Sequence, residues 1–546
     1  MKRIRFSLAA LAATISWMIG AMGNAQAQTP HLFGIHDDVF PGVNTYLGLL
    51  PSGTGWITAT DALGANPSDM GTKNYNPPSG TTIIGRLNYG YFPQGTLPPQ
   101  AQYANFAQRV QNFVAGSSGC NTWVIANETN LAAEWPQVGG TLETVTPENY
   151  AAAYKLCHAA IKAVRPNDVV IPQALAPWAG PYGTGNLGGF THAAMNDPWV
   201  DYYYKMMVAI TTGPGAVTPD GLAMHINTRG YSAGGFNASP INVNTLTLDF
   251  SWGVYRDWLQ YGVPRELWNL PVYATECNGL YYWKGGGPES VGDPTYQAGW
   301  MQRIYSDIHA WNQQARDIGL PVYRAVNMYR WCCDNWALDA EAGGSTAVWS
   351  QLSSDVSAAA AFNYQWPASG GNRLTPGTPP GIKATGIAAS ATSDASQDAG
   401  GPGFEPDKAF DGVASSKWSS RDLGEGASHW LVADLGVQKP INGYIVRHAS
   451  STGLDATTRN TVGFLIETSN VSPTGPWTLQ TMARNNTPGV DGAAVSQFTY
   501  DTPVAARYVR LFINDSGRLT TGSRARIAEL EIYTDSVATA SDWQMF

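Results

Sequence analysis

Eight short apolar runs, separated by segments with helical periodicity, constrain the fold of residues 28–365 more than any other feature. The runs that predict strands are Leu32–His36, Gly55–Thr60, Thr82–Leu87, Thr122–Ala126, Val169–Ala174, Gly221–His225, Val272–Thr275 and Val322–Met328. The segments that predict helices are Ala101–Val114, Pro147–Val164, Trp199–Thr211, Thr245–Tyr261 and Tyr296–Ile318. Strands that alternate with helices favour parallel βα units, and eight such units fit a closed (β/α)8 TIM barrel. An open doubly wound sheet is the alternative, but no glycine-rich phosphate fingerprint follows the first run.

A proline- and glycine-rich segment at 366–382 divides the chain. It keeps no apolar periodicity, and its prolines favour an extended spacer, so we predict a linker there. Residues 383–546 then change to short alternating runs without long helices. This pattern predicts an all-β second domain, a jelly roll or β-sandwich.

The N-terminus has the pattern of an export signal. A basic start at Lys2 and Arg3 precedes the apolar run Phe6–Met22, and an Ala-x-Ala cleavage site ends at Ala27. We therefore predict a signal peptide over residues 1–27 and a secreted protein, extracellular or periplasmic. A membrane anchor is less favoured because the apolar run is short and diluted with Ser, Thr and Gly. No later segment approaches about 18 uninterrupted apolar residues, so we expect no membrane insertion.

The composition excludes several classes of protein. Charged residues make up 13% of the chain and aromatic residues 11%, whereas an ordinary soluble chain has about 25% charged residues. Disordered chains are instead rich in charged residues and poor in aromatic ones, and coiled coils are rich in Glu, Lys and Leu. The net charge of −9 argues against a nucleic-acid partner. The five cysteines include no C-x-x-C pair, which disfavours a Cys/His metal site, and a Cys120–Cys157 disulfide is one option in an oxidising compartment.

Two predicted strands end on glutamates. The fourth closes on Asn127-Glu128 and the seventh on Glu276. In a (β/α)8 barrel the working residues lie at the carboxyl ends of the strands, and strands four and seven lie across the barrel from each other. Glycoside hydrolysis uses two carboxyl groups on either side of one bond, of which one donates a proton and the other attacks or activates water. The alternative is that Glu128 and Glu276 are both ordinary surface acids at the starts of loops.

With Asn127-Glu128 and Glu276 at these strand ends, residues 31–365 resemble the clan A glycoside hydrolases, with family 39 and family 5-like enzymes as neighbours. Members of this clan are retaining (β/α)8 enzymes. The resemblance implies that Glu128 is the general acid/base and that Glu276 is the nucleophile of a glycosyl-enzyme intermediate. Asn127 would hydrogen-bond the sugar 2-hydroxyl, a contact that strengthens in the transition state. This chemistry needs no cofactor.

Five further residues near strand ends are candidate substrate-binding groups. His225 closes strand six, where clan members often have a His or Tyr beside the nucleophile; a structural histidine is the alternative. Trp331, after strand eight, and Trp178, after strand five, are candidate sugar platforms. Arg86, on strand three, is expected to orient a carboxylate. The stretch His36-Asp37-Asp38, with Asp37 as the candidate ligand of the sugar, either lines the cleft floor or belongs to a solvated turn.

The C-terminal region resembles the coagulation-factor type C, or discoidin-like, domain, which includes the family 32 carbohydrate-binding modules. The strings that carry the resemblance are Ala409-Phe410-Asp411-Gly412, Lys417-Trp418-Ser419-Ser420, His429–Gly436, Arg507–Leu511 and Ile527–Tyr533. The resemblance implies a structural calcium ion, with Asp411 and Glu529 as ligands. Such domains also bind lipid or protein surfaces, but the pairing with a glycosidase-like barrel favours a glycan.

These features predict a monomeric, secreted retaining glycoside hydrolase that cleaves β-glycosidic bonds in a polysaccharide or glycoconjugate, targeted by a carbohydrate-binding module. The surplus of Trp and Tyr fits this function, because apolar sugar faces stack on flat rings. A non-catalytic glycan-binding or adhesion protein with a degenerate barrel is one rival. A polysaccharide lyase with a Tyr, His or Lys base is another.

Overall fold

The computed structural model describes residues 28–36, 46–48, 53–91, 93–178, 197–228, 230, 236, 241–243, 246–279, 298–331, 354–355, 366, 372–397, 402–424, 427–453, 455–517 and 524–535. The predicted signal peptide, Asp37 and the pair Cys332-Cys333 lie outside the described residues.

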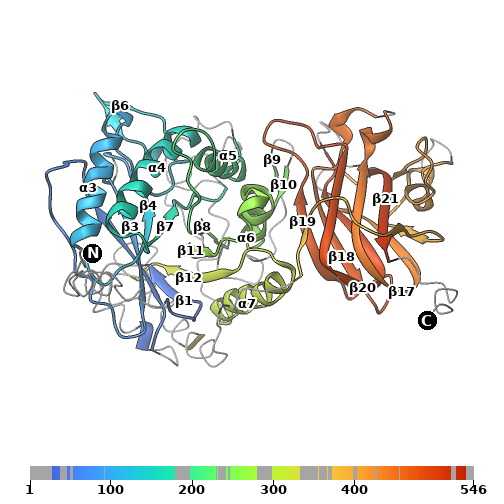
Figure 1. The fold of residues 1–546 in the computed structure, drawn as a ribbon, viewed down its shortest axis with the longest axis horizontal. Coiled ribbons are helices and arrows are strands. Elements are labelled where there is room, and N and C mark those ends of the chain that lie inside the picture. The colour runs from blue at the N-terminus through green and yellow to red at the C-terminus, as the bar shows by residue number, and fades with distance from the viewer. Residues whose placement is uncertain are drawn as a thin grey trace, which may run out of the picture.

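Eight parallel strands form an N-terminal sheet that is nearly closed into a barrel (Figure 1). In chain order they are β1 (Phe33–His36), β2 (Trp56–Ala62), β3 (Thr82–Asn88), β4 (Thr122–Ile125), β7 (Val169–Pro172), β8 (Leu222–His225), β11 (Val272–Cys277) and β12 (Tyr323–Tyr329). The last strand pairs with the first, and β7 and β8 are the two ends of the ladder. Val170 N still donates to Asp220 Oδ2 at 2.8 Å, and Asp220 N donates to Val170 O at 3.1 Å, across this gap. All eight predicted strands are confirmed.

The inside of the barrel is a packed core. Residues at most 1% exposed fill it: Trp56, Ile84, Val124, Ile171, Ala174, Ala223, Tyr273 and Ala325. A β-carbon at Gly34 would lie 2.1 Å from Asn327 Oδ1 and 2.9 Å from Trp56 Cβ, so only glycine fits there. Because a second core covers the outer face, the strands are buried on both sides, which is why they are continuous apolar runs rather than alternating ones.

Residues 46–48, after β1, and 354–355, after β12, are helical. Five helices with complete described bounds follow β3, β4, β7, β8 and β11. They are α3 (Tyr103–Gly116), α4 (Pro147–Val164), α5 (Trp199–Thr211), α6 (Val254–Asp257) and α7 (Trp300–Ile318). The start of α4 agrees with the prediction because Thr146 accepts a hydrogen bond from Asn149 N at 3.2 Å and Pro147 occupies the first turn. The described helices are thus fewer than the eight of a complete (β/α)8 barrel. Short elements complete the domain: η1 (Gln100–Gln102), η2 (Ala132–Glu134), η4 (Trp258–Gly262), η5 (Arg265–Leu267) and the hairpin β5 (Gln137–Val138) with β6 (Thr141–Leu142).

The single long helix predicted over Thr245–Tyr261 is wrong. The structure has a hairpin of β9 (Ile241–Val243) and β10 (Leu246–Leu248), followed by α6 and η4. Asp249 Oδ1 accepts a hydrogen bond from Ser251 N at 2.7 Å. Such a bond to the residue's own downstream backbone offers a turn in place of a helix.

The C-terminal domain is a β-sandwich (Figure 1). Its strands are β13 (Leu374–Pro376), β14 (Ile382–Lys383), β15 (Ala388–Ala391), β16 (Trp418–Ser419), β17 (His429–His448), β18 (Gly463–Ser469), β19 (Thr478–Arg484), β20 (Val495–Asp515) and β21 (Arg526–Thr534), and its short helical turns are η6 (Ala395–Gln397), η7 (Pro406–Ala409), η8 (Ala449–Thr452) and η9 (Thr457–Arg459). The long central strands β17 and β20 pair with each other and surround an apolar core that includes Trp418. Part of the predicted linker is built into this sheet, because β13 pairs with β20 and buries Leu374.

The two domains share a seam between η4 and the strands β18 to β20. Arg484 forms an ion pair with Asp201 of α5 at 2.7 Å and donates to Tyr261 O at 2.6 Å. The Gln260 and Asn514 side-chain amides donate to each other, at 3.3 and 3.1 Å. Apolar side chains of the sandwich, among them Val462 and Met482, join the outer core of the barrel. The domains are therefore packed against each other rather than merely linked.

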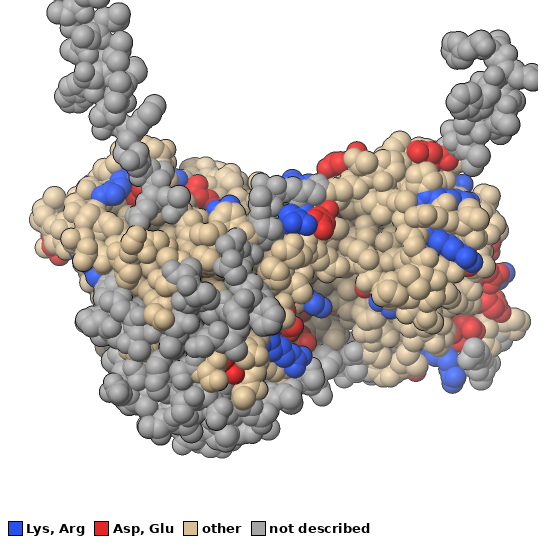
Figure 2. All heavy atoms as spheres, turned by 90° about the horizontal axis from the view of Figure 1, so that it is seen from below, with Lys and Arg blue, Asp and Glu red and all other residues tan. Residues whose placement is uncertain are grey.

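The described chain contains no helix with the length and hydropathy needed to cross a membrane. Uncharged residues cover most of the described surface on the face in Figure 2, where basic and acidic side chains are interspersed. The Cys120–Cys157 disulfide that the sequence allows is not formed. Both cysteines are free and buried, and the Cys120 thiol donates to Thr122 O at 3.3 Å.

Candidate active site

Glu128 and Glu276 meet at the carboxyl ends of the barrel strands. One carboxylate oxygen of each, together with a ring nitrogen of His225, lies within 4.8 Å of the others. Glu128 follows β4, and Glu276 lies near the end of β11, where the pairing with β8 shifts register between Ala274 and Glu276. Such a bulge re-aims a side chain, here the only one of β11 that is not fully buried. The predicted pair is thus brought together.

Arg86 links the two strand ends. Its Nη1 donates to Glu276 Oε1 at 2.5 Å and to Asn127 Oδ1 at 2.8 Å, while its Nε donates to Thr60 Oγ1 at 2.9 Å. Burial alone lowers the pKa of Arg86, but the Glu276 carboxylate outweighs burial and raises it above its ordinary value. Arg86 therefore remains a fixed cation that orients Glu276 and Asn127, which is the placement its predicted role requires.

His225 lies between the two glutamates. Its Nδ1 is 2.7 Å from Glu128 Oε1, and its Nε2 is 3.6 Å from Glu276 Oε1. The ring is held at the end of β8, where its backbone carbonyl accepts a hydrogen bond from Trp258 Nε1 at 2.9 Å. The two carboxylates thus have different partners: an imidazole beside Glu128 and a guanidinium on Glu276.

The backbone around Glu128 is strained. Ala126 and Glu128 have φ angles of +64° and +43°, in the left-handed region that residues with a β-carbon rarely adopt. Each such residue costs about 1–3 kcal/mol and persists only where the surroundings over-determine it. Here Thr96 Oγ1 donates to Asn127 O at 2.7 Å, and Glu128 N donates to Ala174 O at 3.0 Å. Strain of this kind clusters at functional sites.

The two predicted sugar platforms differ from the expectation in their surroundings. Trp331 is only 2% exposed and belongs to the outer core, so its ring faces are covered. Trp178 is partly buried; its Nε1 donates to Asp249 O at 3.1 Å, and its ring meets Phe250 edge to face. Neither contacts the carboxylate pair through an interaction within the described residues.

His36, from the stretch that the sequence offers as a cleft floor, and two residues that the sequence does not mark, Tyr329 and Glu134, also lie near the pair. His36, at the end of β1, has its Nε2 3.7 Å from Glu276 Oε1, and burial followed by the charge of Arg86 holds its pKa well below the ordinary value. Tyr329, which ends β12, packs its ring 4.9 Å from that of His36. His36 and Tyr329 both end barrel strands, so inspecting the residue that ends each strand points to both of them. Glu134 lies in η2, in a loop, where no motif marks it.

Burial and the neighbouring charges of Glu128 and Glu276 raise the pKa of Glu134 to about 8, although Arg86 opposes the shift. Glu134 is thus a third carboxyl group close enough to Glu128 and Glu276 for their charges to affect its pKa.

Glu128, His225 and Glu276 offer two oxygen ligands and one nitrogen ligand that a metal ion could accept. Arg86 already places a cation against Glu276, and a second cation there would be repelled. The arrangement fits an acid–base and nucleophile pair better than a metal centre.

The loop after Asp411 gathers oxygen atoms around one hydroxyl. Ser416 Oγ lies 2.7 and 2.9 Å from the Asp411 carboxylate oxygens, 2.8 Å from Val413 O and 3.4 Å from Lys408 O. Backbone donors also close this loop, since Val413 N donates to Asp411 Oδ1 at 2.9 Å and Ser416 N donates to Val413 O at 3.0 Å. Carboxylate, hydroxyl and carbonyl oxygens are the ligands that a hard cation such as Ca²⁺ prefers. Glu529 contacts the same loop: it accepts from Gly412 N at 2.6 Å, and its other oxygen lies 2.8 Å from Lys383 Nζ.

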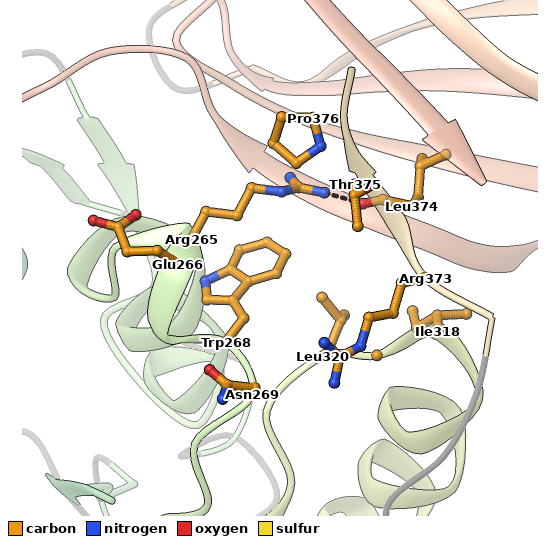
Figure 3. A pocket seen from close by; sticks show the side chains of 11 residues that line it. Arg265, Glu266, Trp268, Asn269, Ile318, Leu320, Arg373, Leu374, Thr375 and Pro376 are labelled. Carbon is orange, nitrogen blue, oxygen red and sulfur yellow. Dashed lines mark hydrogen bonds between the residues drawn. The ribbon is translucent and has the colours of Figure 1, made fainter. Parts of the chain in front are cut away.

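A separate cavity of about 560 Å³ lies between the barrel and β13 (Figure 3). Its lining residues Trp268 and Leu320 precede β11 and β12, so it lies at the amino ends of strands whose carboxyl ends carry the site. Arg265 extends over the Trp268 ring, 4.7 Å from its centre, and donates to Leu374 O. Burial lowers the pKa of Arg265 to about 10. The cavity therefore belongs to the seam between the domains.

If Glu128 and Glu276 are the catalytic pair that the sequence predicts, replacing Arg86 with lysine should lower kcat/KM by about 100-fold, because lysine keeps the charge but loses the planar fork that holds Asn127 and Glu276 together. Steady-state kinetics of the two proteins would measure this change. Arg316→Lys, on an exposed part of α7, is the matched control. A loss below twofold for Arg86→Lys would contradict an orienting role.

Comparison with known proteins assigns the C-terminal domain. The catalase-peroxidase of Erwinia tasmaniensis is 39% identical over 69 residues, which are 13% of this chain and 9% of that protein, so the chain spans less than a tenth of this curated relative. Chitosan-binding module 1 of the chitosanase/glucanase from Paenibacillus sp. IK-5 is 26% identical, with 28% of this chain and 96% of that chain covered and a TM-score of 0.22. The family 32 carbohydrate-binding module of Streptococcus pneumoniae EndoD is 21% identical, with 28% and 100% covered and a TM-score of 0.23. Residues 388–530 match the family model of the F5/8 type C domain. The C-terminal domain is therefore an F5/8 type C, discoidin-like domain.

Proposed function

We propose that this protein is a secreted retaining glycoside hydrolase that cleaves β-glycosidic bonds in a polysaccharide or glycoconjugate, with a (β/α)8 catalytic domain of the clan A type. The observation that carries the proposal is the convergence of Glu128 and Glu276 at the barrel's carboxyl end, each with a different partner. Glycoside hydrolysis needs two carboxyl groups in different roles on either side of one bond, and two glutamates with different partners suit that division.

In the first step a Glu276 oxygen attacks the anomeric carbon, the glycosidic C–O bond breaks, and the leaving oxygen takes the proton of Glu128. In the second step the Glu128 carboxylate takes a proton from water, the water oxygen attacks the same carbon, and the bond to Glu276 breaks. Arg86 orients the nucleophile, Asn127 binds the 2-hydroxyl, and His225 positions Glu128. The steps need no cofactor.

The separation of the two glutamates supports retention. Their nearest ligating oxygens lie within 4.8 Å. Retaining enzymes hold the two carboxyl groups about 5–5.5 Å apart, whereas inverting enzymes separate them by about 6.5–9.5 Å to admit a water molecule. A nearest-oxygen spacing of this size is closer to the retaining range than to the inverting one.

The F5/8 type C domain supports a glycan partner, and we propose that it holds the enzyme at its substrate. The seam fixes this domain to the barrel, so the two glycan-binding surfaces would keep a constant relative position. Export through residues 1–27 and action as a monomer are part of the same proposal.

Product analysis on a panel of polysaccharides and glycoconjugates tests the proposal. We expect new reducing ends from at least one β-linked glycan. Unsaturated products that absorb in the ultraviolet would instead identify a lyase. Binding of a glycan with no product from any member of the panel would favour the non-catalytic alternative.

We also propose that the Asp411 loop holds a calcium ion, with Asp411, Ser416 and the Val413 and Lys408 carbonyl oxygens as ligands. Calcium at 100 times its Kd is expected to raise the melting temperature by about 5–10 °C, since binding to the folded state adds about 2.7 kcal/mol. Thermal unfolding with calcium and with EDTA measures this shift, which Asp411→Asn should abolish and Asp501→Asn should preserve. An unchanged melting temperature in the wild-type protein would contradict the site.

A further inference from the structure

The loop that carries Glu134 is held rigidly against the catalytic strand end. Thr96 N donates to Glu134 O at 3.0 Å, while Thr96 Oγ1 donates to Asn127 O at 2.7 Å, so one residue joins the two positions. Trp135 Nε1 donates to Thr129 O at 2.7 Å. A β-carbon at Gly95 would lie 2.5 Å from Pro136 N, so glycine lets the two chains approach this closely. Glu134 therefore has a fixed position relative to Asn127 and Glu128.

The Glu134 carboxyl group has no structural partner of its own. Its backbone is fully engaged, since Glu134 N donates to Leu131 O at 3.0 Å. Its side chain is partly buried, and among the described residues it accepts no hydrogen bond and forms no ion pair. The charged groups in its field are Glu128 on the β4 end, Glu276 on β11 and Arg86 on β3.

We propose that Glu134 is a third functional carboxyl group of this site, which binds a hydroxyl group of the sugar next to the bond that Glu128 and Glu276 act on. The inference rests on the proposed function of the same cleft. It makes Glu134 a substrate-positioning residue, not a nucleophile or a proton donor to the leaving group.

The charge balance of the cleft supports an uncharged Glu134. Once Glu128 has given its proton to the leaving group, Arg86 offsets only one of the two ionised glutamates, and His36 is held neutral, so a third negative charge would lie beside an anionic pair. Burial and these neighbours raise the pKa of Glu134 to about 8, which keeps the proton below that pH. An uncharged carboxyl group can donate one hydrogen bond and accept another, which suits a sugar hydroxyl. Above pH 8 the ionised group loses the donor.

The first test compares KM and kcat for the wild-type protein, Glu134→Gln and Glu134→Ala between pH 5 and 10. For the wild-type protein we expect KM to rise about 3- to 10-fold as the pH passes 8, the effect of losing one hydrogen bond. The glutamine amide keeps a donor and an acceptor, so this rise should vanish in Glu134→Gln. At every pH, Glu134→Ala should have the raised KM that the wild-type protein has only above pH 8, with little change in kcat. Glu148→Gln, exposed at the start of α4, is the matched control.

The second test needs no substrate. In protein labelled with ¹³C at the glutamate carboxyl carbons, NMR should detect one carboxyl group that titrates between pH 7 and 9 and is absent in Glu134→Gln. Identical KM–pH curves for the wild-type protein and Glu134→Gln would overturn the role of Glu134 while leaving the proposed hydrolysis intact. Inactivity of the wild-type protein on every glycan would instead overturn the proposed function, and this inference with it.

Discussion

Replacing Glu276 with glutamine is expected to lower kcat by about 10⁴-fold or more. An amide cannot form the covalent bond to the anomeric carbon, so the first step of the double displacement is lost. The amide oxygen can still accept the hydrogen bond from Arg86 that now reaches Glu276 Oε1 at 2.5 Å, so the variant should keep the native fold. Initial rates on the best glycan of the panel, with circular dichroism of both proteins, measure the two outcomes.

Glu266→Gln, an exposed residue of η5, is the matched control and should retain full activity. Glu128→Gln should have a different signature from Glu276→Gln. Because aryl leaving groups of low pKa need no proton, its first step should survive on such substrates, while its second step slows. Undiminished turnover by Glu276→Gln would contradict the assignment of the nucleophile.

Replacing Arg484 with alanine is expected to lower the free energy of unfolding by about 3–5 kcal/mol, because it leaves the Asp201 charge buried without its partner. The side chains of Arg484 and Asp201 are 6% and 9% exposed and lie 2.7 Å apart. Burial raises the pKa of Asp201, and Arg484 is the main group that opposes this shift. The same substitution removes the hydrogen bond to Tyr261 O.

Urea unfolding of the full chain, followed by tryptophan fluorescence, measures this change. Arg316→Ala removes the partner of Asp317 in an exposed pair and should cost at most about 1 kcal/mol. Equal, small losses for Arg484→Ala and Arg316→Ala would contradict a seam that stabilises the two domains together.

The strands were predictable from the sequence because a barrel strand is covered on both faces and must be apolar throughout. The segment before α6 was not, since the apolar spacing of Thr245–Tyr261 also suits a helix and only the turn at Asp249 excludes it. The seam was also beyond sequence reasoning. Arg484 and Gln260 look like ordinary surface residues until distant segments cover them.

The meeting of the two glutamates with Asn127, Arg86 and His225 was predictable, because the carboxyl ends of barrel strands lie together and a residue's place at a strand end therefore predicts its place in space. Glu134 was not, because its loop has no periodicity and its function depends on a fold that brings η2 back over β4. Trp331 shows where sequence position says less. A tryptophan after a strand resembles a sugar platform, but this one is buried in the outer core, and composition alone does not distinguish the two uses of an indole.

Covalent trapping tests the central claim most directly. The protein would be incubated with 2,4-dinitrophenyl 2-deoxy-2-fluoro-β-glycosides of several sugars, which form the glycosyl-enzyme quickly and release it slowly. Intact-mass and peptide mass spectrometry should detect one added fluoroglycosyl unit on Glu276 and none in Glu276→Gln, and ¹H NMR of a natural substrate should detect the β-anomer first. Label on another residue, or first appearance of the α-anomer from a β-linked substrate, would contradict a retaining mechanism with Glu276 as the nucleophile.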